Sequence, residues 1–358
     1  MEIGIVGLPR SGKTTMFNAL TRGKVDVGGY SAEPNVGMAR VPDARLEKLD
    51  EMFRPKRRVP AEVKYIDVAA PTKDERSGAF LTHLSQSDGL LHVVRAFSDD
   101  NVPHIEGSVD PERDVRLIDM ELNFSDLTII ERRLHKISAS LKGTKPHERE
   151  AYDREEALLS RLKAALEGDT PIREQALSDE ERKAISGYQF LSAKPLLIVF
   201  NIGESRLKEA ASLEEGWRGK FKRPHVDVAA LCGKLEMELA QLEEDEAQAF
   251  RADMGIPEAA LNRIIRLSYD LLGLISFFTH VSDEVRAWTV HRDTHAVHAA
   301  GRIHTDMERG FIRAEVVSYD DLMKCGSIAE GRKHGLVRVE GKTYVVQDGD
   351  VITFLFNV

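Results

Sequence analysis

The chain has 358 residues, 42% hydrophobic and 30% charged, which suits a folded protein with two or three domains. Its formal net charge of -9 excludes a general electrostatic attraction to nucleic acid, so any RNA contact needs a local patch. We expect no DNA specificity.

The sequence also limits where the protein is expected to work. No apolar run approaches the roughly 18 residues that a membrane span needs, and the N-terminal residues MEIGIVGLP lack the pattern of a secretory signal. Cys232 and Cys325 lie far apart, without the spacing of a disulfide framework or a zinc site. These features predict a cytoplasmic protein that does not contact membranes.

A phosphate-binding loop stands at the start of the chain. Residues 7–14 read Gly-Leu-Pro-Arg-Ser-Gly-Lys-Thr and match G-x-x-x-x-G-K-[ST] in full, between a strand expected at 3–6 and a helix expected at 15–20. Backbone N–H groups of such a loop curl around the β-phosphate, Lys13 would neutralise β- and γ-oxygens, and Thr14 would bind Mg²⁺. A chance glycine turn is the alternative, but the order of strand, loop and helix favours the phosphate site. The candidate residues are Gly7, Arg10, Ser11, Gly12, Lys13, Thr14 and Thr15.

A second magnesium ligand is expected at the end of a neighbouring strand. The apolar run 63–68 contains Asp67, which follows Val63-Lys-Tyr-Ile and is the candidate. Its alternative role is that of a structural aspartate at a strand end.

Further apolar runs predict the remainder of an α/β fold. Short runs at 90–94, 196–200 and 226–229 suit strands buried on both faces of a parallel sheet. Leu and Ile recur at spacings of 3 and 4 from 127 to 141, and again at 159–166 after a turn, which predicts an inserted helical coiled-coil hairpin. Ser178 and Glu181 form a capping box that starts another helix.

The C-terminal region has the pattern of a small α+β module. Strands are expected at 285–290, 311–317 and 351–356, with a hairpin at 337–346 around Glu340-Gly341. The expected domains are a P-loop domain of residues 1–112 and 192–282, a helical domain of 113–191, and a C-terminal domain of 283–358.

The base of the nucleotide would meet Asn201-Ile-Gly-Glu204, which follows the strand at 196–200. Many P-loop GTPases have N-K-x-D here, with the Asp carboxylate accepting from two guanine N–H groups. In this chain Glu204 replaces the Asp and Ile202 replaces the Lys, so the means of preferring guanine is weakened. An ordinary Asn/Gly turn is the alternative.

Several further motifs carry a family resemblance over almost the whole chain. The sequence resembles the Obg-like ATPase family, also called YchF, of the translation-factor-related P-loop NTPases. The matching segments are Gly7-Leu-Pro, Glu33-Pro-Asn-Val-Gly37, Val41-Pro-Asp-Ala-Arg-Leu46, Asn201 with Glu204, Leu235-Glu-Met-Glu-Leu239, Glu284-Val-Arg-Ala-Trp-Thr289, Ala300-Gly-Arg-Ile-His-Thr-Asp306, Arg309-Gly-Phe-Ile-Arg-Ala314 and Asp348-Gly-Asp-Val351.

The resemblance implies a GTPase-like domain, an inserted coiled coil and a ubiquitin-like C-terminal TGS domain. It also implies ATP as the preferred nucleotide over GTP, with Mg²⁺, and association with the ribosome or its rRNA. Cys232 and Gly233 stand where the family places a loop beside the base, although Cys232 is equally well a small buried hydrophobe.

Departures from the family pattern concern catalysis. Arg10 stands where the family usually has Asn, and Ala70 replaces a glycine whose N–H meets the γ-phosphate. The first switch, around Tyr30 to Glu33, lacks the expected threonine, with Ser31 as the candidate substitute, and Pro71 occupies the hydrophobic position after the second switch motif.

Two hypotheses follow from these departures. The protein is a slow ATPase, in which Arg10 stabilises transition-state charge, or it is a nucleotide-binding module that signals by occupancy without hydrolysis. Arg10 as a plain surface residue, and a protein-interaction scaffold built on the hairpin, are further alternatives.

The cluster His291, His295, His298 and His304 suggests a metal but lacks partner ligands, so a polar surface is favoured. The sequence does not predict an oligomeric state.

Overall fold

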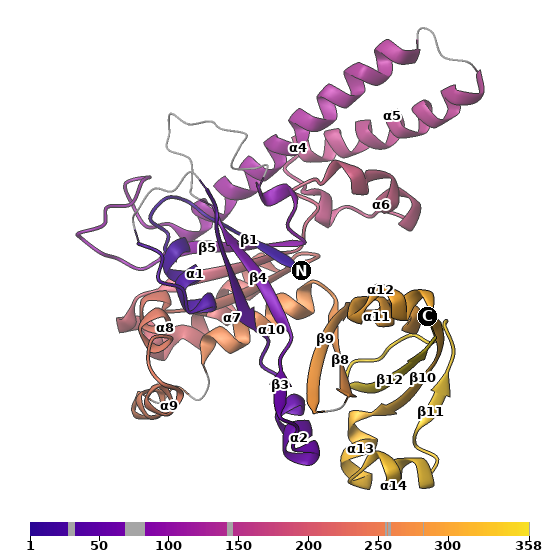
Figure 1. Ribbon diagram of the computed structural model, residues 1–358. Helices are drawn as coiled ribbons and strands as arrows, with labels where there is room; N and C mark the ends of the chain where they lie inside the picture. The colour runs from indigo at the N-terminus through magenta and orange to yellow at the C-terminus, as the bar shows by residue number, and fades with distance from the viewer. Residues whose placement is uncertain are drawn as a thin grey trace. The chain divides into compact units, whose positions relative to one another are not determined.

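The computed structural model describes residues 1–27, 33–68, 83–141, 146–254, 256, 259–281 and 283–357. The chain forms two compact units, and Figure 1 labels most of their helices and strands. The first unit comprises Met1–Gly37 and Lys64–Leu261, and the second comprises Met38–Val63 and Asn262–Val358. Residues 38–63 therefore belong to the same unit as the C-terminal part of the chain.

A sheet with the strand order β2-β4-β1-β5-β6-β7 lies in the first unit, except for residues 38–40 of β2 and 62–63 of β4, which belong to the second. From β4 to β7 all neighbouring strands are parallel, which confirms the predicted P-loop type of sheet. The predicted strands appear here with ends shifted by a residue or two. Their bounds are β1 Glu2–Val6, β4 Glu62–Asp67, β5 Gly89–Ala96, β6 Leu196–Ile202 and β7 Val226–Leu231, whereas β2 Asn35–Arg40 was not predicted.

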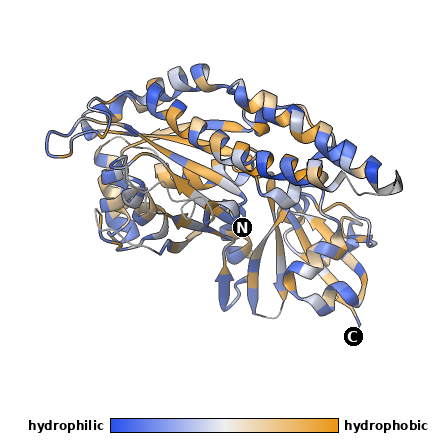
Figure 2. Cartoon of the chain, turned by 90° about the horizontal axis from the view of Figure 1, so that it is seen from above, coloured by the Kyte–Doolittle hydropathy of each residue, from blue (hydrophilic) through white to orange (hydrophobic). Residues whose placement is uncertain are grey.

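The central strands are apolar because both of their faces are covered. Every residue of β5 and β6 is buried, as expected for bare apolar runs in a parallel sheet, and Figure 2 shows the hydrophobic colour concentrated on the strands. The other elements of this unit are α1 Lys13–Thr21, α4 Pro111–Leu141, α5 Pro146–Glu167, η1 Ile172–Glu174, α6 Asp179–Ile185, η2 Ser186–Tyr188, η3 Glu204–Glu209, α7 Ala210–Phe221, α8 Gly233–Leu239, α9 Glu244–Asp253 and α10 Ala260–Leu271, the last of which ends in the second unit.

The predicted helical hairpin is confirmed as α4 and α5, which lie side by side in Figure 1. Helix α4 begins at Pro111, well before the leucine repeat, because proline suits a first helical position and Asp110 accepts from the N–H of Arg113. The Ser178 capping box is present with both of its hydrogen bonds.

The second unit contains a mixed sheet with the order β11-β10-β12-β8-β9-β3. One of its apolar cores joins Phe277, Val316 and Ile352 from the strands to Ala296 and Ala300 of α11, which confirms an α+β C-terminal domain. Its elements are α2 Ala44–Phe53, β3 Arg57–Val59, β8 Leu274–Val281, β9 Glu284–His291, α11 Ala296–Ile303, α12 Thr305–Arg309, β10 Phe311–Ser318, α13 Tyr319–Cys325, α14 Ile328–Lys333, β11 Arg338–Glu340 and β12 Asp350–Phe356.

Two features of this unit differ from the sequence predictions. The boundary expected at 283 separates β8 from β9, whereas these strands pair antiparallel over their full length, so the unit begins before β8. The hairpin expected at 337–346 does not form. Instead β11 pairs with β10, and Val346 is buried in the core, which draws its segment away from β11.

Among the described helices, none has both the length and the apolar character that a bilayer crossing needs.

Candidate nucleotide site

The phosphate loop has the backbone geometry that its glycines permit. Gly7 and Gly12 have φ of 148° and 96°, a region that favours glycine. A Cβ at Gly7 would lie 2.4 Å from the carbonyl oxygen of Val93, and one at Gly12 would lie 2.3 Å from Nδ2 of Asn201. Both glycines are therefore required by the close approach of the neighbouring strands β5 and β6.

Lys13 is the buried cation of the loop, with 7% of its surface exposed. Its Nζ donates to the carbonyl oxygens of Gly7 and Leu8, at 2.9 and 3.1 Å. Burial lowers the pKa of Lys13 to about 8, against the opposing effect of the carboxylates of Asp67 and Glu121. A desolvated ammonium whose hydrogen bonds among the described residues go to carbonyl oxygens is stabilised by an arriving anion, as expected of a phosphate-binding lysine.

Thr14 and Asp67, the two residues predicted to hold magnesium, are in contact with each other. The Thr14 hydroxyl donates to Oδ2 of Asp67 at 2.9 Å, and Nδ2 of Asn35 lies 3.4 Å from the same oxygen. The other carboxylate oxygen, Oδ1, is buried and has no hydrogen-bond partner among the described residues.

These donors fit Mg²⁺, which takes oxygen ligands and is commonly held by one or two carboxylates together with substrate phosphates. The described residues contain no group of three or more His, Cys, Asp or Glu side chains that could hold a metal by themselves. The histidines of the second unit make other contacts instead: His298 pairs with Glu308, and His304 lies near Asp306.

Asn201 joins the phosphate loop to the loop after β7. Its Nδ2 donates to the carbonyl oxygen of Ser11 at 3.0 Å, and its Oδ1 accepts from the N–H of Gly233 at 2.9 Å. Asn201 is 4% exposed, so these bonds are shielded from water and fix the floor between the phosphate end and the expected base end of the site.

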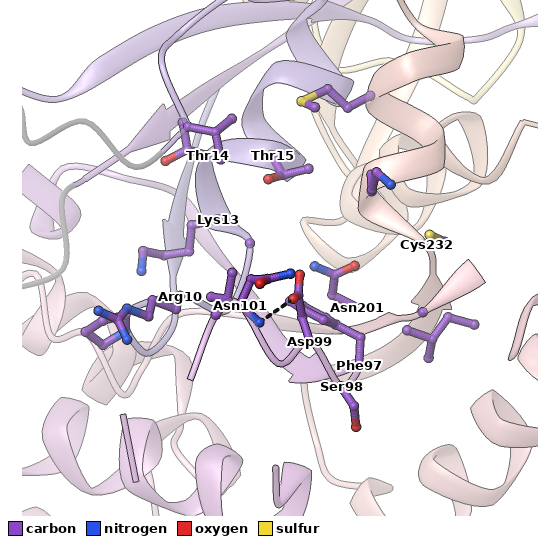
Figure 3. Close-up of a pocket in the computed structure, with 18 of the residues that line it drawn as sticks. Arg10, Lys13, Thr14, Thr15, Phe97, Ser98, Asp99, Asn101, Asn201 and Cys232 are labelled. Atoms are coloured by element: carbon purple, nitrogen blue, oxygen red, sulfur yellow. Dashed lines mark hydrogen bonds between the residues drawn. The ribbon is translucent and has the colours of Figure 1, made fainter. Parts of the chain in front are cut away.

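A cavity of about 900 Å³ extends along this floor. Figure 3 shows Arg10 and Lys13 at one end, Cys232 at the other and Asn201 between them. Of the predicted residues, the cavity is lined by Arg10, Gly12, Lys13, Thr14, Thr15, Asp67, Asn201, Ile202, Glu204 and Cys232. Ser11 and Gly233 adjoin it through their bonds to Asn201, and Gly7 through its bond to Lys13.

The side chains of the predicted base residues differ in their environments. Ile202 is 1% exposed and belongs to the apolar core, so its side chain cannot take the role of the usual lysine. Cys232 is also buried, which raises the pKa of its thiol. Glu204 is exposed, and its carboxylate lies 3.2 Å from Nζ of Lys234.

One wall of the cavity was not predicted from the sequence. It consists of Phe97, Ser98, Asp99, Asn101, Val102 and Pro103, which follow β5. The only signal that could have located it is position, since the carboxyl ends of parallel strands share one edge of the sheet.

Two arginines hold this wall. The guanidinium of Arg95 lies 4.4 Å from the centre of the Phe97 ring and donates to the carbonyl oxygen of Phe97. Arg10 donates from Nη1 to the carbonyl oxygen of Pro103 at 3.0 Å. The remaining expectations, for Ser31, Ala70 and Pro71, concern positions outside the described residues.

Two family models match separate parts of the chain. A family model described as "50S ribosome-binding GTPase" matches residues 2–123. A second model, named for the C-terminal part of YchF GTPases and described as a protein of unknown function, matches residues 274–357, starting at the first residue of β8.

Relatives match over the full length of the chain. "Ribosome-binding ATPase YchF" of Bacillus subtilis is 42% identical over 368 residues and both sequences are fully covered. "Obg-like ATPase 1" of Caenorhabditis elegans is 37% identical, with 100% of this chain and 92% of that protein covered. The solved structure of the Schizosaccharomyces pombe YchF GTPase has a TM-score of 0.87 at 31% identity, and covers 99% of this chain and 97% of its own.

Proposed function

Because the chain belongs to the YchF family of Obg-like ATPases, we propose that it is a ribosome-associated P-loop ATPase that binds ATP and Mg²⁺ in the cavity at Lys13. The observation that supports this most directly is the arrangement of Lys13, Thr14 and Asp67 around one end of the cavity. Ribosome association is inferred from what the names of the relatives say of those proteins.

The residues of the phosphate loop would bind and orient the triphosphate. On binding, Lys13 exchanges its contacts with the Gly7 and Leu8 carbonyl oxygens for phosphate oxygens, which restores the charge balance that burial disturbs. Thr14 and Asp67 would hold Mg²⁺, which when bound neutralises charge on the β- and γ-phosphates.

We assign the base to the end of the cavity near Asn201 and Cys232. Glu204 is in contact with Lys234 and is one methylene longer than the aspartate of GTPases, so the paired acceptor that rewards guanine is lacking. We expect ATP to bind at least as tightly as GTP.

A second candidate function is binding without hydrolysis. Its support is the side chain of Arg10, whose guanidinium donates to the carbonyl oxygen of Pro103 and is therefore not free to contact a phosphate. In this case Arg10 holds the cavity wall, and nucleotide occupancy alone carries the signal.

Equilibrium titration of ATP and GTP, followed by single-turnover hydrolysis with and without ribosomes, tests these proposals. Lys13→Ala should abolish ATP binding, while Lys24→Ala, an exposed lysine beyond α1, should leave it unchanged. Unchanged ATP affinity in Lys13→Ala would refute the phosphate site. Tight binding of ATP without turnover, with ribosomes present, would favour the second candidate.

A further inference from the structure

Lys234 and Glu204 form an ion pair at the base end of the cavity. The Lys234 Nζ lies 3.2 Å from Oε1 of Glu204, and both residues line the cavity. Glu204 begins η3, two residues after the end of β6, and Lys234 is the second residue of α8, which follows β7. The pair therefore connects the two loops between which the purine is expected.

The position of this pair is fixed by buried contacts beneath it. Asn201, three residues before Glu204, accepts from the N–H of Gly233, the residue before Lys234. Because this bond is buried and holds the two loops together, both side chains project from backbone of fixed separation. Glu238 also lines the cavity, and its charge adds to the attraction on Lys234.

The ion pair should affect the binding of guanine and adenine differently, because the two purines present different hydrogen-bonding groups. Guanine is distinguished by adjacent N–H donors at N1 and the 2-amino group, which need a free carboxylate acceptor, whereas adenine has an acceptor at N1. A lysine ammonium is a donor only. When Lys234 holds Glu204, it competes with guanine for the carboxylate, whereas adenine does not need that acceptor.

We propose that Lys234 is a positioning residue for base selectivity, which withholds the Glu204 carboxylate from guanine and thereby favours ATP over GTP. This inference rests on the proposed function, since it concerns the same cavity. The quantity that tests this role is the ratio of the GTP and ATP affinities. A loss of phosphate binding or of folding weakens both nucleotides equally and therefore leaves this ratio unchanged.

Both members of the pair are more than half exposed, so the expected effect is modest. Exposed ion pairs have coupling energies that correspond to between about 1.5- and fivefold in an equilibrium constant. We expect Lys234→Ala to raise the ratio of GTP to ATP affinity about threefold, and Lys234→Arg to keep the wild-type ratio. Lys208→Ala changes an exposed lysine of η3 that does not line the cavity, and serves as the control.

A double-mutant cycle isolates the route through Glu204. Glu204→Gln removes the charge that Lys234 holds, so Lys234→Ala should have no further effect on the ratio in that background. Higher salt screens exposed pairs, so the wild-type ratio should move toward that of Lys234→Ala at 0.5 M NaCl while the ratio of the variant stays constant.

Titration of ATP and GTP against wild type, the two single variants and the double variant decides the matter. An unchanged ratio in Lys234→Ala, or an equal change with and without Glu204, overturns the role of Lys234 while leaving the ATPase proposal intact. If wild type binds neither nucleotide in the presence of Mg²⁺, the proposed function itself fails.

Discussion

Arg45 and Asp348 lie 303 positions apart in the sequence, and the guanidinium of Arg45 donates to both carboxylate oxygens of Asp348, at 2.8 and 3.2 Å. The same guanidinium is paired with Asp43 at 2.8 Å and lies over the ring of Phe278. Asp348 also accepts from the N–H of Ser276 at 2.9 Å. These contacts join α2, β8 and the turn before β12 within the second unit.

Asp348→Ala is expected to lower the free energy of unfolding by about 1–2 kcal/mol, because it leaves the Ser276 N–H without its acceptor and Arg45 with one carboxylate. The exposure of Asp348, 46% for its side chain, keeps the loss at this modest level. Asp348→Asn retains an acceptor for Ser276 and should lose less. Urea unfolding measures both, and wild-type stability in both variants would contradict the assignment.

His92 predicts a pH dependence of stability. It is 1% exposed in the middle of β5, and neither ring nitrogen has a hydrogen-bond partner among the described residues. Burial lowers the pKa of His92 from 6.5 to about 3, so the folded state stays neutral while the unfolded state takes up a proton below about pH 6.5. Stability therefore falls as pH decreases from 6.5 toward 3, and His92 should cost about 2 kcal/mol between pH 7.5 and 5.

The matched variant is His92→Leu, which removes the titrating group and both unpaired nitrogens. It should be as stable as wild type or more stable at pH 7, because burying a polar group without partners is unfavourable. The advantage of the variant should grow as the pH is lowered to 5, as followed by chemical denaturation. A constant difference between the two proteins across this range would exclude His92 as the source.

Thr14→Ala should remove most of the effect of Mg²⁺ on ATP affinity while leaving binding in EDTA close to that of wild type. The hydroxyl contributes one of the oxygens at the expected metal position, and its loss leaves Asp67 without this donor. Thr14→Ser keeps the oxygen and serves as the control. An undiminished response to Mg²⁺ in Thr14→Ala, measured by calorimetry, would place the metal elsewhere.

Asn201→Ala should weaken ATP binding at least tenfold, because it breaks both bonds that hold the phosphate loop and the Gly233 loop to β6. Asn201→Asp keeps the acceptor for Gly233 and loses the donor to Ser11, so it separates the two contributions. ATP titration, with thermal unfolding as a check on folding, measures both variants. Wild-type affinity in Asn201→Ala would remove Asn201 from the site.

The parts of the site that follow a local rule could be predicted from the sequence. Lys13 and Thr14 belong to a contiguous motif, and Asp67 and Asn201 each stand at the end of an apolar run that can only be a buried strand. The parallel sheet then brings all of these residues to one edge, where the structure places them.

Other features depend on packing that no local pattern encodes. The wall at 97–103 has no motif, and its position is set by Arg95 and Arg10, whose partners are backbone carbonyl groups. The segment 337–346 has turn chemistry and alternating apolar residues, yet Val346 is drawn into the core. Strand β8 shows little alternation of apolar and polar residues, because its first six residues are all buried, and the sequence therefore did not predict it.

The membership of residues 38–63 in the second unit also bears on synthesis of the chain. The backbone of β3 pairs with β9, and Lys56 pairs with Asp283, which is translated 227 residues later. At roughly 5–20 residues per second, a nascent chain carries α2 and β3 without these partners for about 10–45 s. During this interval β3 is an unpaired strand, and the ring of Phe53, which stacks on His280 in the finished protein, lacks its cover. The early part of the chain is thus exposed to aggregation or chaperone capture on the ribosome until β8 and β9 have emerged.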